Sequence, residues 1–454
     1  YQGVVAMKAV QDNIQSLAKA TTFTVTTGHQ LNVFTGPLYF IYKIVTVINT
    51  CRQLQAAYPE YTFVPVYWMA SEDHDYDEIK YFRLYGKKYT WHTNQKGAVG
   101  RFSLNDFQSL LQEVPGDISV FREAYNKSKT LSEAVRHYIN TLFGTDGLVV
   151  VDGDDATLKA AFAAVMSDDI LKSKTRSLVH QTNTQLEELG YKPQIFCRDI
   201  NFFYLGNQLR SRIEKKNEKY EVLDTHYTFN ESELQQEINE HPQRFSPNVI
   251  LRPLYQEMIL PNLAYVGGPA EIVYWLQLKS VFEFYDVPFP VLLPRNFAMI
   301  MEETVVRKFN KTGLTLTDIF EDKNYLFNHW VLTHSPRNLT VGEERTKLLA
   351  LFDDLQQRAE LVDQSLRAHV AAEGKRALNS LENIERKMLR AEKRMHADKL
   401  RQIEAVKDVL FPNGSLQERT DNFLNFYQQD ENFIEKVKVL FDPFDFQFQV
   451  LMNN

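Results

Sequence analysis

The stretch Phe23–Asp77 constrains the fold of this chain more than any other part of the sequence. It opens with a β-rich run, Phe23–Thr27, and continues as a polar loop with glycines at both ends, Gly28–Gly36. A helix is predicted from Pro37, because apolar residues recur there at helical spacing and proline suits the first helical position. A second strand, Phe63–Met69, follows. Strand, helix and strand of this length form a right-handed unit with parallel strands.

Polar residues follow both strands of this unit, and parallel strands bring such residues to one edge of the sheet. The loop after the second strand, Ser71–Glu78, carries five carboxylates and one histidine. Open α/β sheets bind ligands at this edge, where a helix N-terminus also favours anions. We therefore expect Gly28–Gly36 and Ser71–Asp77 to line one pocket. A second Gly-Pro pair places Gly267–Glu271 at the same edge.

The remaining sequence extends this unit into an α/β fold with a Rossmann-like parallel sheet and connective insertions. The core is predicted over residues 1–300, with insertions near 80–145 and 155–247. Residues 301–340 are predicted to form a helical connector. Further predicted strands lie at 147–152, 194–196, 201–205, 248–251, 263–266 and 290–293; the pair 194–196 and 201–205 is expected to belong to the second insertion.

Residues 341–410 contain no proline, and their apolar residues alternate in steps of three and four. This heptad pattern predicts an α-helical antiparallel coiled-coil arm. Its turn is placed either at Asp363–Ser365, which could cap a new helix, or at Gly374. The apolar face is long enough to suggest a homodimer formed through the arm, with a hairpin folded on its own core as the alternative. Residues 411–454 are expected to pack back on the core.

Composition excludes several classes of protein. The chain has 454 residues and a net charge of -7, whereas a general nucleic-acid binder shows a basic excess. Two cysteines are too few for a disulfide scaffold or a structural zinc site. No apolar run approaches the roughly 18 residues of a membrane span. We expect a cytoplasmic enzyme that acts on small molecules, with no nucleic-acid or membrane partner.

The acidic loop supplies the candidate catalytic residues Asp73, His74 and Asp75, with Ser71 and Glu72 as candidate binding residues. Carboxylates at a strand end can orient an amine, hold Mg²⁺ or act as a general base. Two alternatives remain open. The Ser71–Asp77 cluster could serve a metal-dependent hydrolase, or the core could bind a metabolite without catalysis.

Other candidates come from the remaining loops. His29 is a further candidate catalytic residue. Arg210, Arg252 and Arg295 could bind carboxylates or other anions, because the guanidinium fork matches them. The other candidate substrate- or nucleotide-binding residues are Gly28, Gln30, Thr35, Gly36, Gly267, Gly268 and Glu271.

Several of these stretches resemble one known family. The T-G-H-Q run at Thr27–Gln30, the F-T-G-P-L-Y run at Phe34–Tyr39 and the S-E-D-H-D run at Ser71–Asp75 resemble the bacillithiol biosynthesis cysteine-adding enzymes, a family of proposed cysteine ligases. Further matching runs lie at Gly267–Ile272, Leu293–Asn296, Leu410–Gly414 and Leu416–Arg419. Members of this family carry a longer segment before the first motif, so we expect a chain trimmed at its N-terminus.

The resemblance implies a reaction. In this reaction L-cysteine is joined to the amine of glucosaminyl-malate, which forms the low-molecular-weight thiol bacillithiol. The resemblance also implies a core like that of class I aminoacyl-tRNA synthetases, with ATP or another nucleotide as cofactor and Mg²⁺ as an optional second cofactor. The synthetase motif His-x-Gly-His has its counterpart at Thr35–Leu38, which keeps the glycine but lacks both histidines. This difference puts classical adenylation in doubt.

Overall fold

The computed structural model describes residues 1 and 3–452 of the chain. The chain divides into two compact units. The first comprises Tyr1–Met299 and Gln417–Val450, and the second comprises Ile300–Leu416 with Leu451 and Met452. Each unit is described by itself. No helix within the described ranges is both long and apolar enough to cross a membrane.

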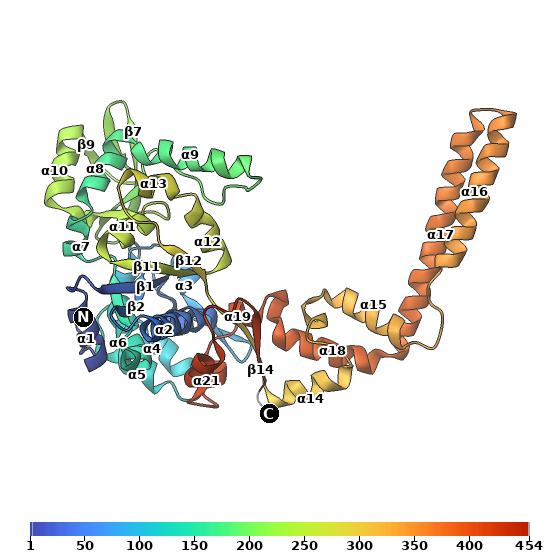
Figure 1. Cartoon of the computed structure of the whole chain (residues 1–454), viewed down its shortest axis with the longest axis horizontal. Coiled ribbons are helices and arrows are strands. Elements are labelled where there is room, and N and C mark those ends of the chain that lie inside the picture. Colours follow the sequence, from blue (N-terminus) through green and yellow to red (C-terminus); the bar gives the residue numbers. More distant parts are fainter. Residues whose placement is uncertain (2, 453–454) are drawn as a thin grey trace. The chain divides into compact units, whose positions relative to one another are not determined.

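The first unit is built on a five-stranded parallel sheet in the order β12-β11-β1-β2-β5 (Figure 1). Its strands are β1 (Thr22–His29), β2 (Thr62–Met69), β5 (Val149–Asp152), β11 (Asn262–Gly267) and β12 (Val291–Pro294). The central strand β1 pairs with β2 without interruption from Thr22↔Thr62 to His29↔Met69. The predicted Rossmann-like parallel core is thereby confirmed.

Helices cover both faces of this sheet. The helix α2 (Tyr39–Ala57) lies on one face, and α11 (Arg252–Ile259), α12 (Pro269–Leu276) and α13 (Lys279–Phe284) lie on the other (Figure 1). Every residue of α2 from Phe40 to Cys51 is buried, so this helix is covered all round rather than along one stripe. Part of the cover comes from α21 (Phe433–Leu440), near which the Asn49 amide donates to the carbonyls of Lys438 and Phe441.

Two insertions interrupt the core. The first consists of α3 (Tyr76–Ile79), the hairpin β3 (Tyr81–Leu84) and β4 (Lys87–Thr90), and α4 (Gln108–Glu113), α5 (Ser119–Lys127) and α6 (Leu131–Phe143). The second begins with α7 (Ala156–Ala160), α8 (Ala163–Lys172) and α9 (Lys174–Glu188). It continues with an antiparallel sheet in the order β10-β6-β7-β8-β9 and with α10 (Glu231–Glu240). The strands of that sheet are β6 (Phe202–Gly206), β7 (Leu209–Lys216), β8 (Lys219–Val222), β9 (Thr228–Phe229) and β10 (Phe245–Pro247).

Two predicted strands are wrong. Residues 194–196 form no strand, because the backbone N–H groups of Gln194 and Ile195 both donate to the side chain of Gln277 instead of a neighbouring strand. Residues 248–251 form the turn before α11, where the Asn248 side chain accepts from the N–H of Ile250. Neither stretch forms a ladder of backbone bonds, and Phe196 and Val249 are exposed at 80% and 41%. An apolar run alone does not show whether a strand forms.

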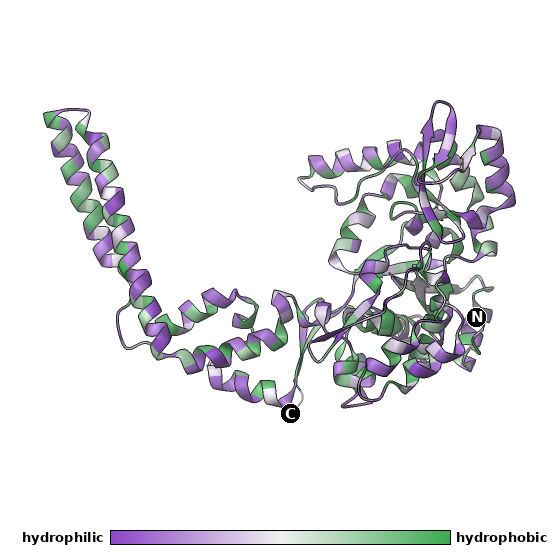
Figure 2. Ribbon diagram, turned by 180° about the vertical axis from the view of Figure 1, so that it is seen from behind, coloured by the Kyte–Doolittle hydropathy of each residue, from purple (hydrophilic) through white to green (hydrophobic). Residues whose placement is uncertain are grey.

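The second unit is helical. It contains α14 (Glu303–Thr312), α15 (Lys323–His334), α16 (Gly342–Val362), α17 (Leu366–Met395) and α18 (Ala397–Leu410). The helices α16 and α17 run side by side as an antiparallel hairpin, and polar and apolar residues alternate along both (Figure 2). The predicted coiled coil is confirmed, with its turn at Asp363–Ser365. Gly374 lies inside α17, where an added Cβ would come within 2.9 Å of the Phe352 ring.

The loop between β1 and α2 has an unusual backbone that the C-terminal segment stabilises. Phe34, Thr35 and Gly36 have φ angles of 51°, 70° and 63°. The fully buried Asn422 amide donates to the carbonyls of Phe34 at 2.7 Å and of Gly36 at 2.6 Å. These two bonds satisfy the carbonyl groups of the first and last residues of this positive-φ stretch.

We expect Asn422→Ala to lower the free energy of unfolding by about 2 kcal/mol, because two buried carbonyls lose their donor. Urea unfolding followed by circular dichroism measures the change. Asn105→Ala, at an exposed position of the same unit, is the matched control and should leave the unfolding curve in place. Equal curves for the two variants would show that the amide does not stabilise this loop.

Candidate functional site

A pocket of about 690 Å³ opens at the carboxyl-terminal edge of the parallel sheet. It lies between the ends of β1 and β2, the start of α12 and one wall of the second insertion. The candidate residues that line it are Gly28, His29, Gln30, Glu72, Asp73, His74, Arg210, Arg252, Gly268, Glu271 and Arg295. Residues that lie far apart in the sequence therefore meet at the edge where parallel sheets bind ligands.

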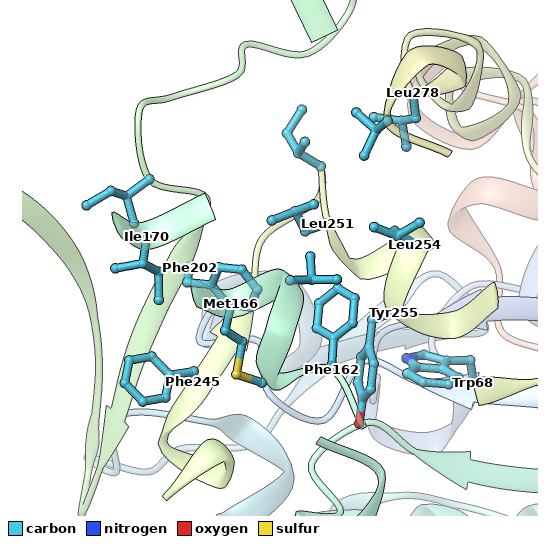
Figure 3. Packing of buried hydrophobic residues seen from close by; sticks show 14 of the residues in the cluster. Trp68, Phe162, Met166, Ile170, Phe202, Phe245, Leu251, Leu254, Tyr255 and Leu278 are labelled. Carbon is cyan, nitrogen blue, oxygen red and sulfur yellow. The ribbon is translucent and has the colours of Figure 1, made fainter. Parts of the chain in front are cut away.

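The wall from the second insertion is held in place by apolar packing. Trp68 of β2 packs edge-on against Tyr255 of α11, and Tyr255 packs against Phe162 at the start of α8 (Figure 3). Phe202 and Phe245, from two paired strands of the antiparallel sheet, belong to the same buried cluster (Figure 3). This shared core fixes the position of β7, which carries Arg210, relative to the parallel sheet.

Asp73 lies at the centre of a polar cluster. Its carboxylate accepts hydrogen bonds from Gln30 Nε2 at 2.9 Å and from Arg210 Nη1 at 3.3 Å. Arg210 also contacts His74 Nδ1 at 2.6 Å and lies 3.9 Å from the centre of the Phe203 ring. Burial raises the pKa of Asp73, but its bonds with His74 and Gln30 and the Arg210 charge outweigh it and hold the pKa well below its usual range. Asp73 is therefore an ionised acceptor rather than a proton carrier near neutral pH.

Glu72 differs from Asp73 because it is tied to charges behind the pocket. The ammonium group of Lys159, which is fully buried, lies 2.5 Å from Glu72 Oε1 and 3.1 Å from Asp154 Oδ1. Arg101 holds Asp154 through two bonds of 2.6 and 2.7 Å. Burial raises the pKa of Glu72 above its usual range, against the attraction of Lys159. Glu72 is therefore the better candidate of the two carboxyl groups for exchanging a proton.

Lys43 is a pocket residue that the sequence reasoning missed. Its ammonium group lies 2.5 Å from Glu271 Oε2 and donates to the Gly28 carbonyl at 2.9 Å. Glu271 also accepts from the Gly268 N–H at 2.7 Å and from Tyr265 Oη at 3.0 Å. Burial raises the pKa of Glu271, but Lys43 and these hydrogen bonds lower it overall. One signal was available, because Lys43 is the only charged residue between Tyr39 and Cys51, the buried part of this helix.

His29 is partly buried and neutral. Burial and the positive charges of Lys43 and Arg295 lower its pKa well below the usual range. Its ring stacks on Phe40 with centres 4.9 Å apart, and its Nε2 atom has no hydrogen-bond partner among the described residues. His29 therefore presents a neutral imidazole at the pocket.

Gly28 gives Arg252 room to approach the end of β1. A Cβ at Gly28 would lie 3.4 Å from Arg252 Nη1 and 3.3 Å from Tyr265 Oη. Arg252 Nη1 donates to Gln256 at 3.0 Å, which holds the guanidinium beside the pocket. A larger residue at position 28 would have to displace one of these two groups.

Two further arginines of the pocket lining, Arg295 and Arg419, differ in their partners. Arg295 forms a buried, two-bond ion pair with Glu418, with distances of 3.0 and 2.5 Å. Its charge is therefore largely compensated. Arg419 also lines the pocket, and within the described part of the chain no carboxylate lies within ion-pair distance of it. It was quoted above only as part of a family motif, and the fold makes it the more available cation.

Five other candidates lie outside the pocket lining: Thr35, Gly36, Ser71, Asp75 and Gly267. Ser71 donates to the carboxylate of Asp152, and Asp75 caps the short helix α3. The N–H of Leu38, the residue before α2, is also engaged, because it donates to the Asp421 carbonyl at 2.7 Å. Over residues 1 and 3–452, no group of three or more His, Cys, Asp or Glu side chains is arranged to hold a metal ion.

Among solved structures, the chain is similar to tryptophanyl-tRNA synthetase from Plasmodium falciparum. The sequences are 12% identical, the match covers 91% of this chain and 85% of that protein, and the TM-score is 0.24. A TM-score this low does not establish a shared fold.

Similarity to other sequences is much stronger. Relatives from Cytophaga hutchinsonii and Flavobacterium psychrophilum are 42% and 41% identical to this chain. The matches cover 99% and 97% of this chain and 86% and 85% of those proteins. A relative from Bacillus cytotoxicus is 29% identical over 94% of this chain and 84% of its own length. All three bear the name "Putative cysteine ligase BshC".

Two family descriptions match nearly the whole chain. The N-terminal Rossmann-like domain of bacillithiol biosynthesis BshC matches residues 1–296. The C-terminal coiled-coil domain of the same proteins matches residues 298–452. The chain therefore belongs to the BshC family of bacillithiol biosynthesis proteins.

Proposed function

We propose that this protein is a cysteine ligase that joins the carboxyl group of L-cysteine to the amine of glucosaminyl-malate, the last step of bacillithiol synthesis. Membership of the BshC family supports the class of reaction. The observation that carries the proposal is the pocket itself. It combines carboxylates that can bind and deprotonate an amine with cations that can bind a dicarboxylate or an activated acyl group.

Amide formation requires an activated carboxylate. In the proposed reaction, the cysteine carboxylate attacks a phosphorus atom of ATP or another nucleotide, with Mg²⁺ as an optional partner. Attack on the terminal phosphorus gives an acyl-phosphate and releases the nucleoside diphosphate, whereas attack on the innermost phosphorus gives an acyl-adenylate and releases pyrophosphate. The acceptor amine then attacks the acyl carbon, the C–N bond forms, and the C–O bond to phosphate or AMP breaks. Arg419, which lines the pocket and forms no ion pair with a described carboxylate, balances the negative charge of that leaving group in this proposal.

The two acidic residues take different roles in this proposal. Asp73, kept ionised by its hydrogen bonds and by Arg210, orients the acceptor amine. Glu72, whose pKa is raised by burial, accepts the proton that the amine loses on attack. Lys159 holds Glu72 from behind, and its stem is not part of the pocket lining.

We expect Asp73→Asn to lower kcat by about 100-fold or more, because the amine loses the group that positions it for attack. Mass-spectrometric detection of the thiol product from cysteine, glucosaminyl-malate and ATP measures the change. Asp77→Asn is the matched control, since Asp77 lies four residues further along, in α3, and outside the pocket. If purified Asp73→Asn keeps wild-type turnover and an unchanged circular dichroism spectrum, Asp73 contributes only to the structure of its loop and not to the reaction.

The pH profile tests the assignment of Glu72. A base must be deprotonated, so kcat/KM should fall as the pH drops through the raised pKa of Glu72. Asp73 has a depressed pKa and should contribute no limb near neutral pH. We expect Glu72→Gln to be slow and to lack the acidic limb, and Asp73→Asn to be slow and to keep it. An acidic limb that persists unchanged in Glu72→Gln would identify another base.

We propose that the coiled-coil hairpin α16–α17 joins two copies of the chain. Apolar side chains stay exposed on it, including Leu361, Val362 and Met395 at 90%, 80% and 66%. Two-fold symmetry is the commonest arrangement for such an assembly.

We expect light scattering to give a dimer for the full chain and a monomer when Lys347–Leu381 is replaced by a short Gly-Ser linker. This deletion keeps the bond between the Val341 N–H and Glu385 at the base of the hairpin. Circular dichroism controls for folding of the shortened protein. A full-length protein that scatters as a monomer at micromolar concentration would contradict the proposal.

A further inference from the structure

A phenylalanine stands exposed at the rim of the pocket. Phe196 lies in the segment between α9 and β6, lines the pocket and is 80% exposed. Single exposed apolar residues are common and need no explanation by themselves. The position of Phe196 is different, because the backbone on both sides of it is held by buried side chains.

Gln277, at the C-terminal end of α12, holds the segment before Phe196. Its Oε1 atom accepts from the N–H groups of Gln194 at 2.7 Å and Ile195 at 3.0 Å, and its Nε2 atom donates to the Ile195 carbonyl at 3.1 Å. Gln277 is only 1% exposed. The residue next to Phe196 is thus bound through both of its backbone polar groups.

Asn201 holds the segment after Phe196 in the same way. Its side chain accepts from the Arg198 N–H at 3.1 Å and donates to the Arg198 carbonyl at 2.9 Å. Asn201 is itself bound by the fully buried carboxylate of Asp169 through bonds of 2.6 and 3.0 Å. Cys197, between the two, points into the core. Phe196 is therefore held outward on an ordered support.

The surface beside Phe196 combines apolar and positive groups. Pro247, at the end of β10, and the half-exposed Val249, in the turn that follows, extend the apolar rim. Arg198 and Arg210 line the same pocket. Arg210 is bound to Asp73, whereas no carboxylate within the described ranges forms an ion pair with Arg198. The wall thus offers one aromatic face and one uncompensated guanidinium on the side of the acidic cluster.

We propose that this wall is the acceptor subsite, in which Phe196 packs against the apolar face of a sugar ring and Arg198 binds a carboxylate of the attached dicarboxylate. The inference rests on the ligase function proposed above. A pyranose ring presents C–H groups on its face and hydroxyl groups at its edge, so a fixed aromatic ring matches the face. The guanidinium fork matches a carboxylate. Arg210 lies on the same wall and is bound to Asp73. An acceptor held on this wall therefore has its amine beside Asp73, the carboxylate that orients it.

Binding without turnover tests the subsite. Isothermal titration calorimetry measures the affinity of glucosaminyl-malate for the full-length protein in the absence of cysteine and nucleotide. We expect Phe196→Ala and Arg198→Met each to weaken this affinity about tenfold or more, and Phe196→Tyr to restore most of it. Tyr191→Ala is the matched control, because Tyr191 is 66% exposed on the same segment but lies outside the pocket.

The outcomes separate the subsite from the reaction. Acceptor affinity unchanged by Phe196→Ala would overturn the inference, even if the wild-type protein makes product. Weakened ATP binding with unchanged acceptor binding would assign Phe196 to the nucleobase and would also overturn it. Acceptor binding that depends on Phe196, in a protein that forms no amide product, would uphold the subsite and reject the proposed function.

Discussion

The parallel pairing of β1 with β2 is the constraint on which the rest of the first unit depends. The register runs without a break from Thr22↔Thr62 to His29↔Met69, so both strands end level with one another. That alignment places Gln30 within 2.9 Å of Asp73 although 43 positions separate them. A shift of one residue would turn each side chain of a strand to the other face of the sheet and would separate the two loops.

Charge compensation shapes the pocket at the end of these strands. A buried ion is costly unless it is paired, and removal of one partner from such a pair costs roughly 3–5 kcal/mol. Two sets of ion pairs at the pocket meet this requirement. Lys43 pairs with Glu271, and Lys159 pairs with Glu72 and Asp154. The same pairs set the proton affinities of the pocket carboxylates, so the groups that stabilise the site also tune it.

The C-terminal segment of the first unit completes the pocket. Glu418 neutralises Arg295, and Asn422 supports the loop that precedes α2. These anchors lie on either side of Arg419 and present its guanidinium to the pocket. A segment more than 380 positions after β1 is therefore part of the pocket lining.

The sequence by itself determined the parallel α/β core, the coiled-coil hairpin and the loops that meet at the sheet edge, because hydrophobic periodicity and turn residues are local signals. It also identified His29, Asp73 and Glu271 as candidate site residues. Only the tertiary structure decided that Arg295 is compensated and Arg419 is not, that Lys43 reaches the pocket, and that residues 194–196 are not a strand. The physical reason is that ion pairing, burial and side-chain anchoring depend on which residues the fold brings together, and no local pattern records those partners.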